Sequence, residues 1–459
     1  MVVLVSTASA AAAAGCSRAA VREAPVNVLL VVIDTLRADA LGCYGAARPT
    51  SPNLDALADR SIVFERSFST APWTVPAVAS LLTGTYPSLH GHTESQGPQG
   101  RLSDDLVTLA EALAAGGHRT AAFSAHPWVS PDFGLGQGFA PSDFHLFAFP
   151  GGDPQVTAAV ERWLETSGDA VEGRPFFAYV HYMRPHSPYD PTAEAQRRVL
   201  GRVAEPPPFS AALARVPRDR SFAFLGESAR RGEVTEADLV HLRGLYEAEV
   251  RMADDEVGRL LEALRRNGLE DETLVIVTSD HGEAFLENGE VLHGNTLNQE
   301  MLHVPLIVHR PAQRGPVRVA HRVQSVDVVP TVLDALGLPV PPQVQGRSRL
   351  PGRRRPREDS VFAEAAFGEA ARQVRVMRGP FSFIGEPGSQ SSARLHNLLE
   401  DPLETQDAAA RFPRQVERMR REARRFVRRN ESRRVALVRT APAPDPQTLE
   451  AVRALGYVR

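Results

Sequence analysis

Residues 27–35 read NVLLVVIDT, and this stretch decides the fold class. Its six consecutive apolar residues leave no alternating position for a solvated face. They therefore predict a central strand of a parallel sheet, covered on both sides. Asp34 follows at the carboxyl end of this strand. Because ligands of open α/β sheets bind outside the carboxyl ends of the strands, Asp34 is a candidate site residue.

Other apolar runs along the chain end in polar residues in the same way. They are TAAFSAH (120–126), PFFAYVHYMRPH (175–186), TLVIVTSDHG (273–282) and VPLIVHRP (304–311). Helical patterns separate them, at 54–61, 106–117, 156–167 and about 236–267. This alternation predicts an α/β fold with a doubly wound, mostly parallel sheet flanked by helices.

Composition divides the chain into three parts. Residues 1–25 are expected to be a leader and linker, 26–345 a large α/β domain, and 346–459 a smaller C-terminal subdomain with an Arg-rich helix around 412–436. The boundary is the segment QGRSRLPGRRRPRE at 345–358. We expect the helix to present a solvated face, with contact to a membrane surface as the alternative. Residues 190–235 are rich in Pro and Arg and lack clear periodicity, which favours an extended surface loop over a lid.

The N-terminus is an apolar run of small residues that ends in Ala-Ala-Gly before Cys16. This pattern resembles a bacterial lipobox, in which the cysteine is acylated. We therefore expect a signal peptide and an exported protein, either a lipoprotein anchored to the cell envelope through Cys16 or a periplasmic protein. An ordinary secretory signal or an Ala-rich leader is the alternative. Cys43 is the only other cysteine, so no intramolecular disulfide is expected in the mature chain.

The overall charge does not favour nucleic acid as a partner. The 459 residues are 43% hydrophobic and carry a formal net charge of −3, so no basic excess favours nucleic acid. All 52 basic residues are Arg, and consequently no lysine ammonium can take part in a site.

A candidate nucleophile lies in TAPWTVPAVASLLTG at residues 70–84. Pro76 suits the first turn of a helix, and Gly84 can end that helix with positive φ. Thr74 lies at the start of the helix, where free N–H groups and the helix dipole favour an anion. Taken alone, the fragment favours Thr74 as a simple helix cap.

Eight segments in order resemble the sulfatase branch of the alkaline phosphatase superfamily, over nearly the whole chain after the leader. They are VLLVVIDTLRADALGCYG, TSPNLDALADRSIVFERSFS, the stretch ending LLTGTYPSLHG, YVHYMRPHSPY, LVIVTSDHGEAF, VPLIVHRP, SVDVVPTVLDALGL and HNLLEDPLET. The resemblance implies a sulfatase-like catalytic domain over 26–345.

The resemblance puts Thr74 in the nucleophile position, ten residues before Gly84. Sulfatases convert a Cys or Ser there to formylglycine, which a threonine cannot become. Val78 stands where the family has an assisting Arg, FSAHPW lacks the family's Lys, and Thr35 replaces the second of two acids. The chain is therefore similar to superfamily branches that use a threonine, such as phosphodiesterases, phosphonate hydrolases and phosphoglycerol or phosphoethanolamine transferases.

The resemblance also implies the site residues. Asp34, Thr74, Asp280 and His281 are expected to bind one divalent metal ion, because two carboxylates, an imidazole and a hydroxyl suit Ca²⁺, Mn²⁺ or Zn²⁺. His186 is expected near the non-bridging oxygens of the substrate, and His293 is expected to protonate the leaving group. A second metal held with His293, with Asp190 as a remote partner, is the alternative. Glu283 is a weaker candidate, and His126 and His181 are expected to be structural.

The predicted activity is hydrolysis of a sulfate or phosphate ester through a covalent Thr74 intermediate, with a phosphodiester or phosphonate favoured. A transferase of the phosphoglycerol or phosphoethanolamine type and a non-catalytic binding protein are the alternatives. The substrate is expected to be a small-molecule, glycan or lipid ester. The sequence does not assign the natural substrate or the oligomeric state.

Overall fold

The computed structural model describes residues 26–93, 100–148, 151–170, 174–311, 313, 315–351, 360–367, 372–389 and 393–437. The predicted leader and Cys16 lie outside these residues. Within the described part of the chain, no helix combines the length and the apolar content needed to cross a bilayer.

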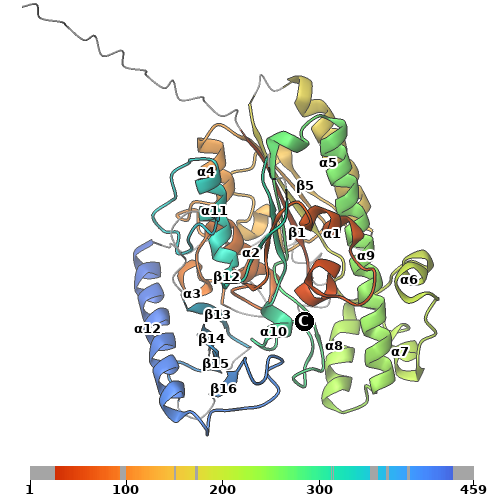
Figure 1. Cartoon of the computed structure of the whole chain (residues 1–459), viewed down its shortest axis with the longest axis vertical. Coiled ribbons are helices and arrows are strands. Elements are labelled where there is room, and N and C mark those ends of the chain that lie inside the picture. Colours follow the sequence, from red (N-terminus) through yellow and green to blue (C-terminus); the bar gives the residue numbers. More distant parts are fainter. Residues whose placement is uncertain are drawn as a thin grey trace, which may run out of the picture.

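The strand β1 (Asn27–Ile33) lies in the middle of an eight-stranded sheet, as its sequence predicts (Figure 1). It pairs in parallel with β6 (Phe176–Tyr182) on one side and β7 (Thr273–Thr278) on the other. The sheet order is β11-β2-β10-β7-β1-β6-β4-β5. The remaining strands are β2 (Ile62–Phe64), β4 (Arg119–Ser124), β5 (Phe144–Leu146), β10 (Leu306–His309) and β11 (Val317–Val319). Only β10 runs antiparallel to its neighbours, so the sheet is mostly parallel.

Helices cover both faces of this sheet, which explains the uninterrupted apolar run of β1. Leu29, Val31 and Ile33 pack with α1 (Pro52–Ala58), α5 (Gly152–Ala170) and α9 (Glu236–Arg266). Alternate residues Val28 and Leu30 pack with α2 (Thr74–Thr83), α4 (Leu109–Ala115) and α11 (Val328–Ala335). The predicted doubly wound α/β class is confirmed.

The helix α2 begins and ends where its sequence predicts. Thr74 is its first residue, and Pro76 occupies the first turn, where a missing N–H breaks no helical bond. Gly84 has φ 65° and donates its N–H to the carbonyl of Ser80. Every residue of α2 is buried, so the position of Thr74 is fixed by packing along the whole helix.

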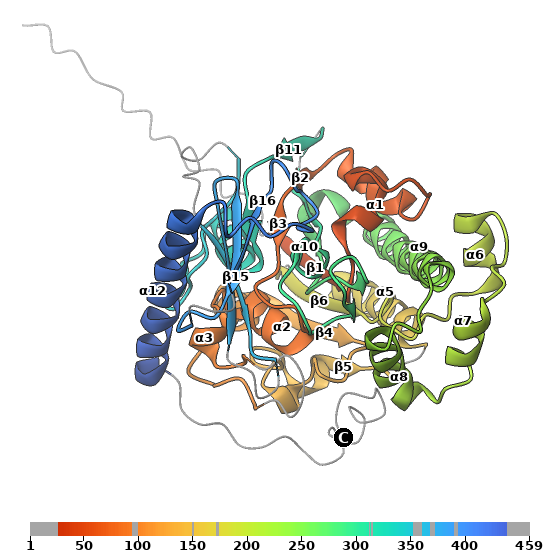
Figure 2. The ribbon, with the colours of Figure 1, turned by 90° about the horizontal axis from the view of Figure 1, so that it is seen from below.

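The C-terminal part forms an antiparallel sheet of β13 (Val361–Ala365), β14 (Gln373–Arg378), β15 (Phe381–Gly385) and β16 (Arg394–Asn397). The predicted Arg-rich helix is α12 (Pro413–Leu437), and it packs on this sheet through Met419, Ala423 and Phe426 (Figure 2). The division between residues 345 and 346 remains a prediction.

The expected extended loop at 190–235 is wrong. This region contains α6 (Ala193–Leu200), α7 (Pro208–Leu213) and α8 (Arg218–Arg230), which lie beside α9 at the opposite end of the molecule from α12 (Figures 1 and 2). These helices are short and bury few side chains each, so their periodicity in the sequence is weak. Leu225 of α8 packs with Leu242 of α9 and with Leu292.

The connecting elements are short. They comprise α3 (Pro87–His90), α10 (Gln299–Leu302), the paired strands β3 (Ser67–Phe68) and β12 (Val323–Gln324), and the paired strands β8 (Ala284–Phe285) and β9 (Val291–Leu292).

Candidate nucleophile and metal site

The carboxyl ends of the central strands bring the predicted site residues together. Asp34 follows β1, Asp280 and His281 follow β7, and Thr74 opens α2. All four side chains are buried. Thr74 Oγ1 lies 3.2 Å from His281 Nε2, which in turn lies 3.4 Å from Asp280 Oδ2 and 3.8 Å from Asp34 Oδ1. These separations suit ligands that converge on one cation.

The hydrogen bonds of the two acids leave oxygens available for a cation. Asp280 Oδ1 accepts the N–H of His281 at 2.8 Å and that of Thr35 at 3.3 Å, whereas Oδ2 has no hydrogen-bond partner among the described residues. Neither oxygen of Asp34 has one either. Burial and the neighbouring Asp280 raise the pKa of Asp34 well above its ordinary value. A divalent cation would compensate both buried charges, so the donor set fits a metal ion.

The turn after β1 has an unusual backbone conformation, and a side chain of α9 stabilises it through hydrogen bonds. Thr35 has φ 53°, a left-handed conformation that is uncommon for a β-branched residue. The Tyr246 hydroxyl donates to the carbonyl of Thr35 and accepts the N–H of Arg37, each at 2.9 Å. This arrangement directs the Thr35 N–H toward Asp280, and α9 thereby helps to orient a site acid.

Two histidines that we expected to be structural lie against Asp34. His126 Nε2 is 3.1 Å from Asp34 Oδ2, and His181 Nε2 is 3.5 Å from the same oxygen. Burial lowers the pKa of His126 well below its ordinary value and that of His181 to about 4, so both imidazoles favour the neutral form that can ligate a metal. Both residues lie at strand ends, which was the signal in the sequence.

His126 and His186, together with Asp34, form a second group whose donor atoms lie within 4.8 Å of one another. The two groups share Asp34. Asp190, the expected remote partner of a second metal, instead forms a 2.8 Å ion pair with Arg218 and is largely exposed. The residues that could hold a second cation are therefore not the ones that we expected.

His293 lies beside the group, with its ring centroid 4.8 Å from those of His281 and His186. Its Nδ1 is 2.9 Å from Glu283 Oε1, and the Tyr189 hydroxyl donates to Glu283 Oε2 at 2.9 Å. Burial raises the pKa of Glu283 to about 8. Glu283, a weaker candidate from sequence, thus orients the His293 ring. The Nε2 atom of His293 is directed away from Glu283.

Aromatic side chains cover this side of the site. Phe222 of α8 lies edge-on to His293 at 5.1 Å between ring centroids, and Trp73 lies 5.7 Å from the same ring. The region 190–235 therefore places Phe222 over the site. A lid, the alternative to an extended loop, requires such a residue. Val78, in the position of the family Arg, is buried in the core and supplies no charge to the site.

Comparisons with known proteins agree with this architecture. The family model named Sulfatase matches residues 26–338. Arylsulfatase K of Bos taurus is 24% identical over 85% of this chain and 79% of its own length. The multifunctional alkaline phosphatase superfamily protein PehA of Trinickia caryophylli is 27% identical over 71% of this chain and 76% of its own length. The phosphonate monoester hydrolase of Agrobacterium radiobacter superposes with a TM-score of 0.68 at 22% identity, covering 88% of this chain and 96% of that one.

Proposed function

The chain belongs to the sulfatase family of hydrolases, and from this premise we propose that it cleaves a sulfate or phosphate ester through a covalent ester on Thr74. The observation that carries the proposal is the 3.2 Å approach of Thr74 Oγ1 to His281 Nε2. A threonine at a helix start needs no such neighbour to act as a cap.

We propose that Asp34, Asp280, His281 and Thr74 hold one divalent cation, Ca²⁺, Mn²⁺ or Zn²⁺. Such an ion, when bound, supplies positive charge that lowers the pKa of a neighbouring hydroxyl. The chain's own contribution is to hold Thr74 at the N-terminal end of α2, where the helix dipole also favours a developing negative charge.

The reaction then proceeds in two displacements. Thr74 Oγ1 loses its proton to solvent and bonds to the phosphorus or sulfur, and the bond from that atom to the leaving oxygen breaks. His293, oriented by Glu283, gives a proton to the leaving oxygen and then recovers from solvent the proton that Thr74 released. A water molecule then attacks the same centre, the bond to Oγ1 breaks, and Thr74 regains a proton.

Phosphoester chemistry is the favoured version. Threonine cannot form the formylglycine of sulfatases, and no arginine occupies the position of Val78. The relative PehA is named a multifunctional alkaline phosphatase superfamily protein, which supports testing several ester classes.

The test is turnover of aryl sulfate, phosphate monoester, phosphate diester and phosphonate substrates by wild type and Thr74→Ala. We expect phosphodiester or phosphonate cleavage, lowered by at least about 10³-fold in the variant. Thr83→Ala is the matched control, because it removes a buried hydroxyl from the other end of α2. Cleavage of aryl sulfate alone would overturn the phosphoester preference, and equal loss in both variants would overturn the role of Thr74.

We further propose a second cation held by Asp34, His126 and His186. The support is that Asp34 Oδ2 and His126 Nε2 are both buried, lie 3.1 Å apart and form no hydrogen bond with each other. Metal analysis of the purified protein should give two equivalents for wild type and one for His126→Ala. One equivalent in both would refute the second cation.

Export and acylation of Cys16 also remain proposals. The support is the run of small residues before Cys16. Labelled palmitate should enter the wild-type protein and not Cys16→Ser, and incorporation into both would contradict a lipobox.

A further inference from the structure

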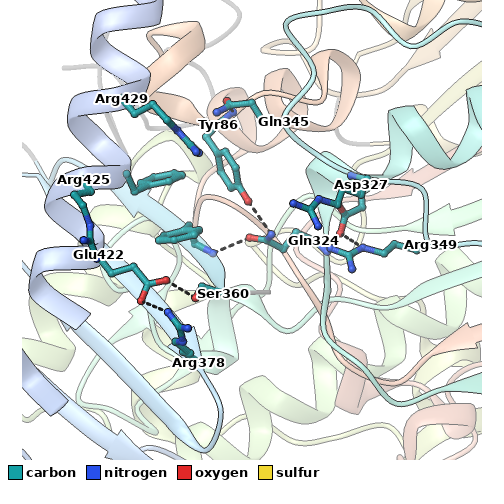
Figure 3. Close-up of a pocket in the computed structure, with 13 residues that line it drawn as sticks. Tyr86, Gln324, Asp327, Gln345, Arg349, Ser360, Arg378, Glu422, Arg425 and Arg429 are labelled. Atoms are coloured by element: carbon teal, nitrogen blue, oxygen red, sulfur yellow. Dashed lines mark hydrogen bonds and ion pairs between the residues drawn. The ribbon is translucent and has the colours of Figure 1, made fainter. Parts of the chain in front are cut away.

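A cavity lies between α12, the C-terminal sheet and the segments around 324–327 and 345–349 (Figure 3), on the other side of the molecule from α8 (Figure 2). Its volume is about 720 Å³, within the range of small-ligand sites. Among its described lining residues, none belongs to the Thr74 site. Tyr86 lines it just beyond the C-terminal end of α2, whereas Thr74 opens the same helix. Ten residues of helix separate these two ends by roughly 15 Å.

Arginine dominates the charge of this cavity. Five arginines line it against two acids. Arg349 pairs with Asp327 at 2.8 Å, and Arg378 pairs with Glu422 at 3.0 Å. These pairs neutralise both acids, so the remaining guanidinium groups leave the lining positively charged.

Of the three lining arginines outside these two pairs, Arg347, Arg425 and Arg429, the last two lie on α12. They lie one turn apart on α12, and neither has an ion pair with an acid of the described chain. Figure 3 shows Arg429 extending from α12 toward Tyr86 and Gln345. Residues four apart on a helix lie on the same face, so both side chains line one wall of the cavity, with Arg425 directed along α12 toward Glu422 (Figure 3). Guanidinium groups match the geometry of sulfate and phosphate oxygens.

The floor of the cavity adds a neutral donor and an apolar surface. The Tyr86 hydroxyl accepts a 2.7 Å hydrogen bond from Gln324 Nε2, which leaves its own proton to donate. Burial raises the pKa of this hydroxyl, so it stays protonated. Phe362 and Phe426 stack at 4.1 Å between ring centroids, and both line the cavity. The apolar face of an organic ring, such as the C–H face of a sugar, would find contact here beside the cationic rim.

We propose that this cavity is a second ligand site that binds a sulfate or phosphate monoester of a ring compound, such as a sugar. The anionic group lies between Arg425 and Arg429, and the ring lies over Phe362. The site is independent of Thr74 chemistry.

The experiment uses Thr74→Ala protein, so that no ligand is consumed, and measures binding by calorimetry. The probes are glucose 6-sulfate and glucose 6-phosphate, with glucose, inorganic sulfate and inorganic phosphate as comparisons. Adding Arg425→Gln and Arg429→Gln should weaken one binding event by at least tenfold. The matched control adds Arg418→Gln and Arg428→Gln, which remove two exposed arginines of α12 outside the cavity. The control should bind like its parent.

Equal binding by the Arg425/Arg429 variant and its parent would overturn the site. Inorganic sulfate and phosphate binding as tightly as the sugar esters would overturn the ring contact. Tyr86→Phe should weaken the same event several-fold with an unchanged circular dichroism spectrum, and unchanged binding would remove Tyr86 from the site. Since Thr74 is absent throughout, a failure of the proposed hydrolysis leaves this test unaffected.

Discussion

Replacing Asp34 by Asn should stabilise the protein without a divalent cation and remove the stabilisation that a cation gives. Asp34 is fully buried, neither of its oxygens is hydrogen-bonded, and Asp280 lies beside it. Leaving a buried polar group unsatisfied costs about 1–3 kcal/mol. An amide removes the repulsion from Asp280 and can donate to the neutral imidazole of His126, 3.1 Å from Asp34 Oδ2. The metal-free variant should therefore gain stability of about that size.

A divalent cation should make wild type more stable than Asp34→Asn. A ligand at 100 times its dissociation constant stabilises the folded state by about 2.7 kcal/mol, provided that the unfolded chain does not bind it. Wild type should gain this amount, whereas Asp34→Asn, which lacks a carboxylate shared by both donor groups, should gain little.

Urea unfolding after EDTA dialysis, with and without added Zn²⁺, Mn²⁺ or Ca²⁺, measures both effects. Asp254→Asn is the matched control, because Asp254 is a buried acid that instead accepts the N–H groups of Asn53 and Leu54 at 3.0 and 2.8 Å. The control should lose stability under both conditions and keep the full cation effect. An equal cation effect in Asp34→Asn and wild type would refute the assignment of Asp34.

Three further outcomes are expected. His126→Ala should lower activity by about 10–100-fold, as loss of groups around a metal does, whereas His145→Ala, a half-buried histidine stacked on Phe123, should leave it unchanged in the same assay. Glu283→Gln should lower kcat by about 10–100-fold and shift the pH profile of kcat while the cation effect on unfolding is retained; an unchanged profile would contradict the orienting role. Burial raises the pKa of Glu249 to about 8. The folded state therefore holds a proton that the unfolded chain loses near pH 4–5. The free energy of unfolding should fall as pH rises from about 4 to 8. Glu249→Gln should flatten that fall in urea unfolding at pH 5 and pH 8, and an unchanged slope would assign the effect to another group.

The sequence predicts the central fold because local pattern and burial agree there. The apolar run of β1 is continuous since both of its faces are covered, and α9 carries a capping box at Thr235 and Asp238 as well as helical periodicity. The helices of 190–235 were missed because each buries only a few side chains, which leaves little periodicity to detect.

The candidate site was predicted only in part, because ligand groups depend on which strands are neighbours. Asp34, Asp280 and His281 follow β1 and β7, which are directly paired. His126 follows β4, which is separated from β1 by β6, and the sequence does not specify that order. Asp190 was expected near His293, but its side chain turns to Arg218 on the surface, a contact that neither residue type nor spacing indicates.

A covalent mechanism requires that Thr74 carries the reacting group during turnover. The most direct measurement is mass spectrometry of peptides from wild-type protein that is acid-quenched while it cleaves a slow phosphonate or phosphate ester. We predict an added phosphonyl or phosphoryl mass on the peptide that contains Thr74, and none in Thr74→Ala. Steady cleavage with an unmodified Thr74 peptide, at a rate that Thr74→Ala shares, would contradict the account.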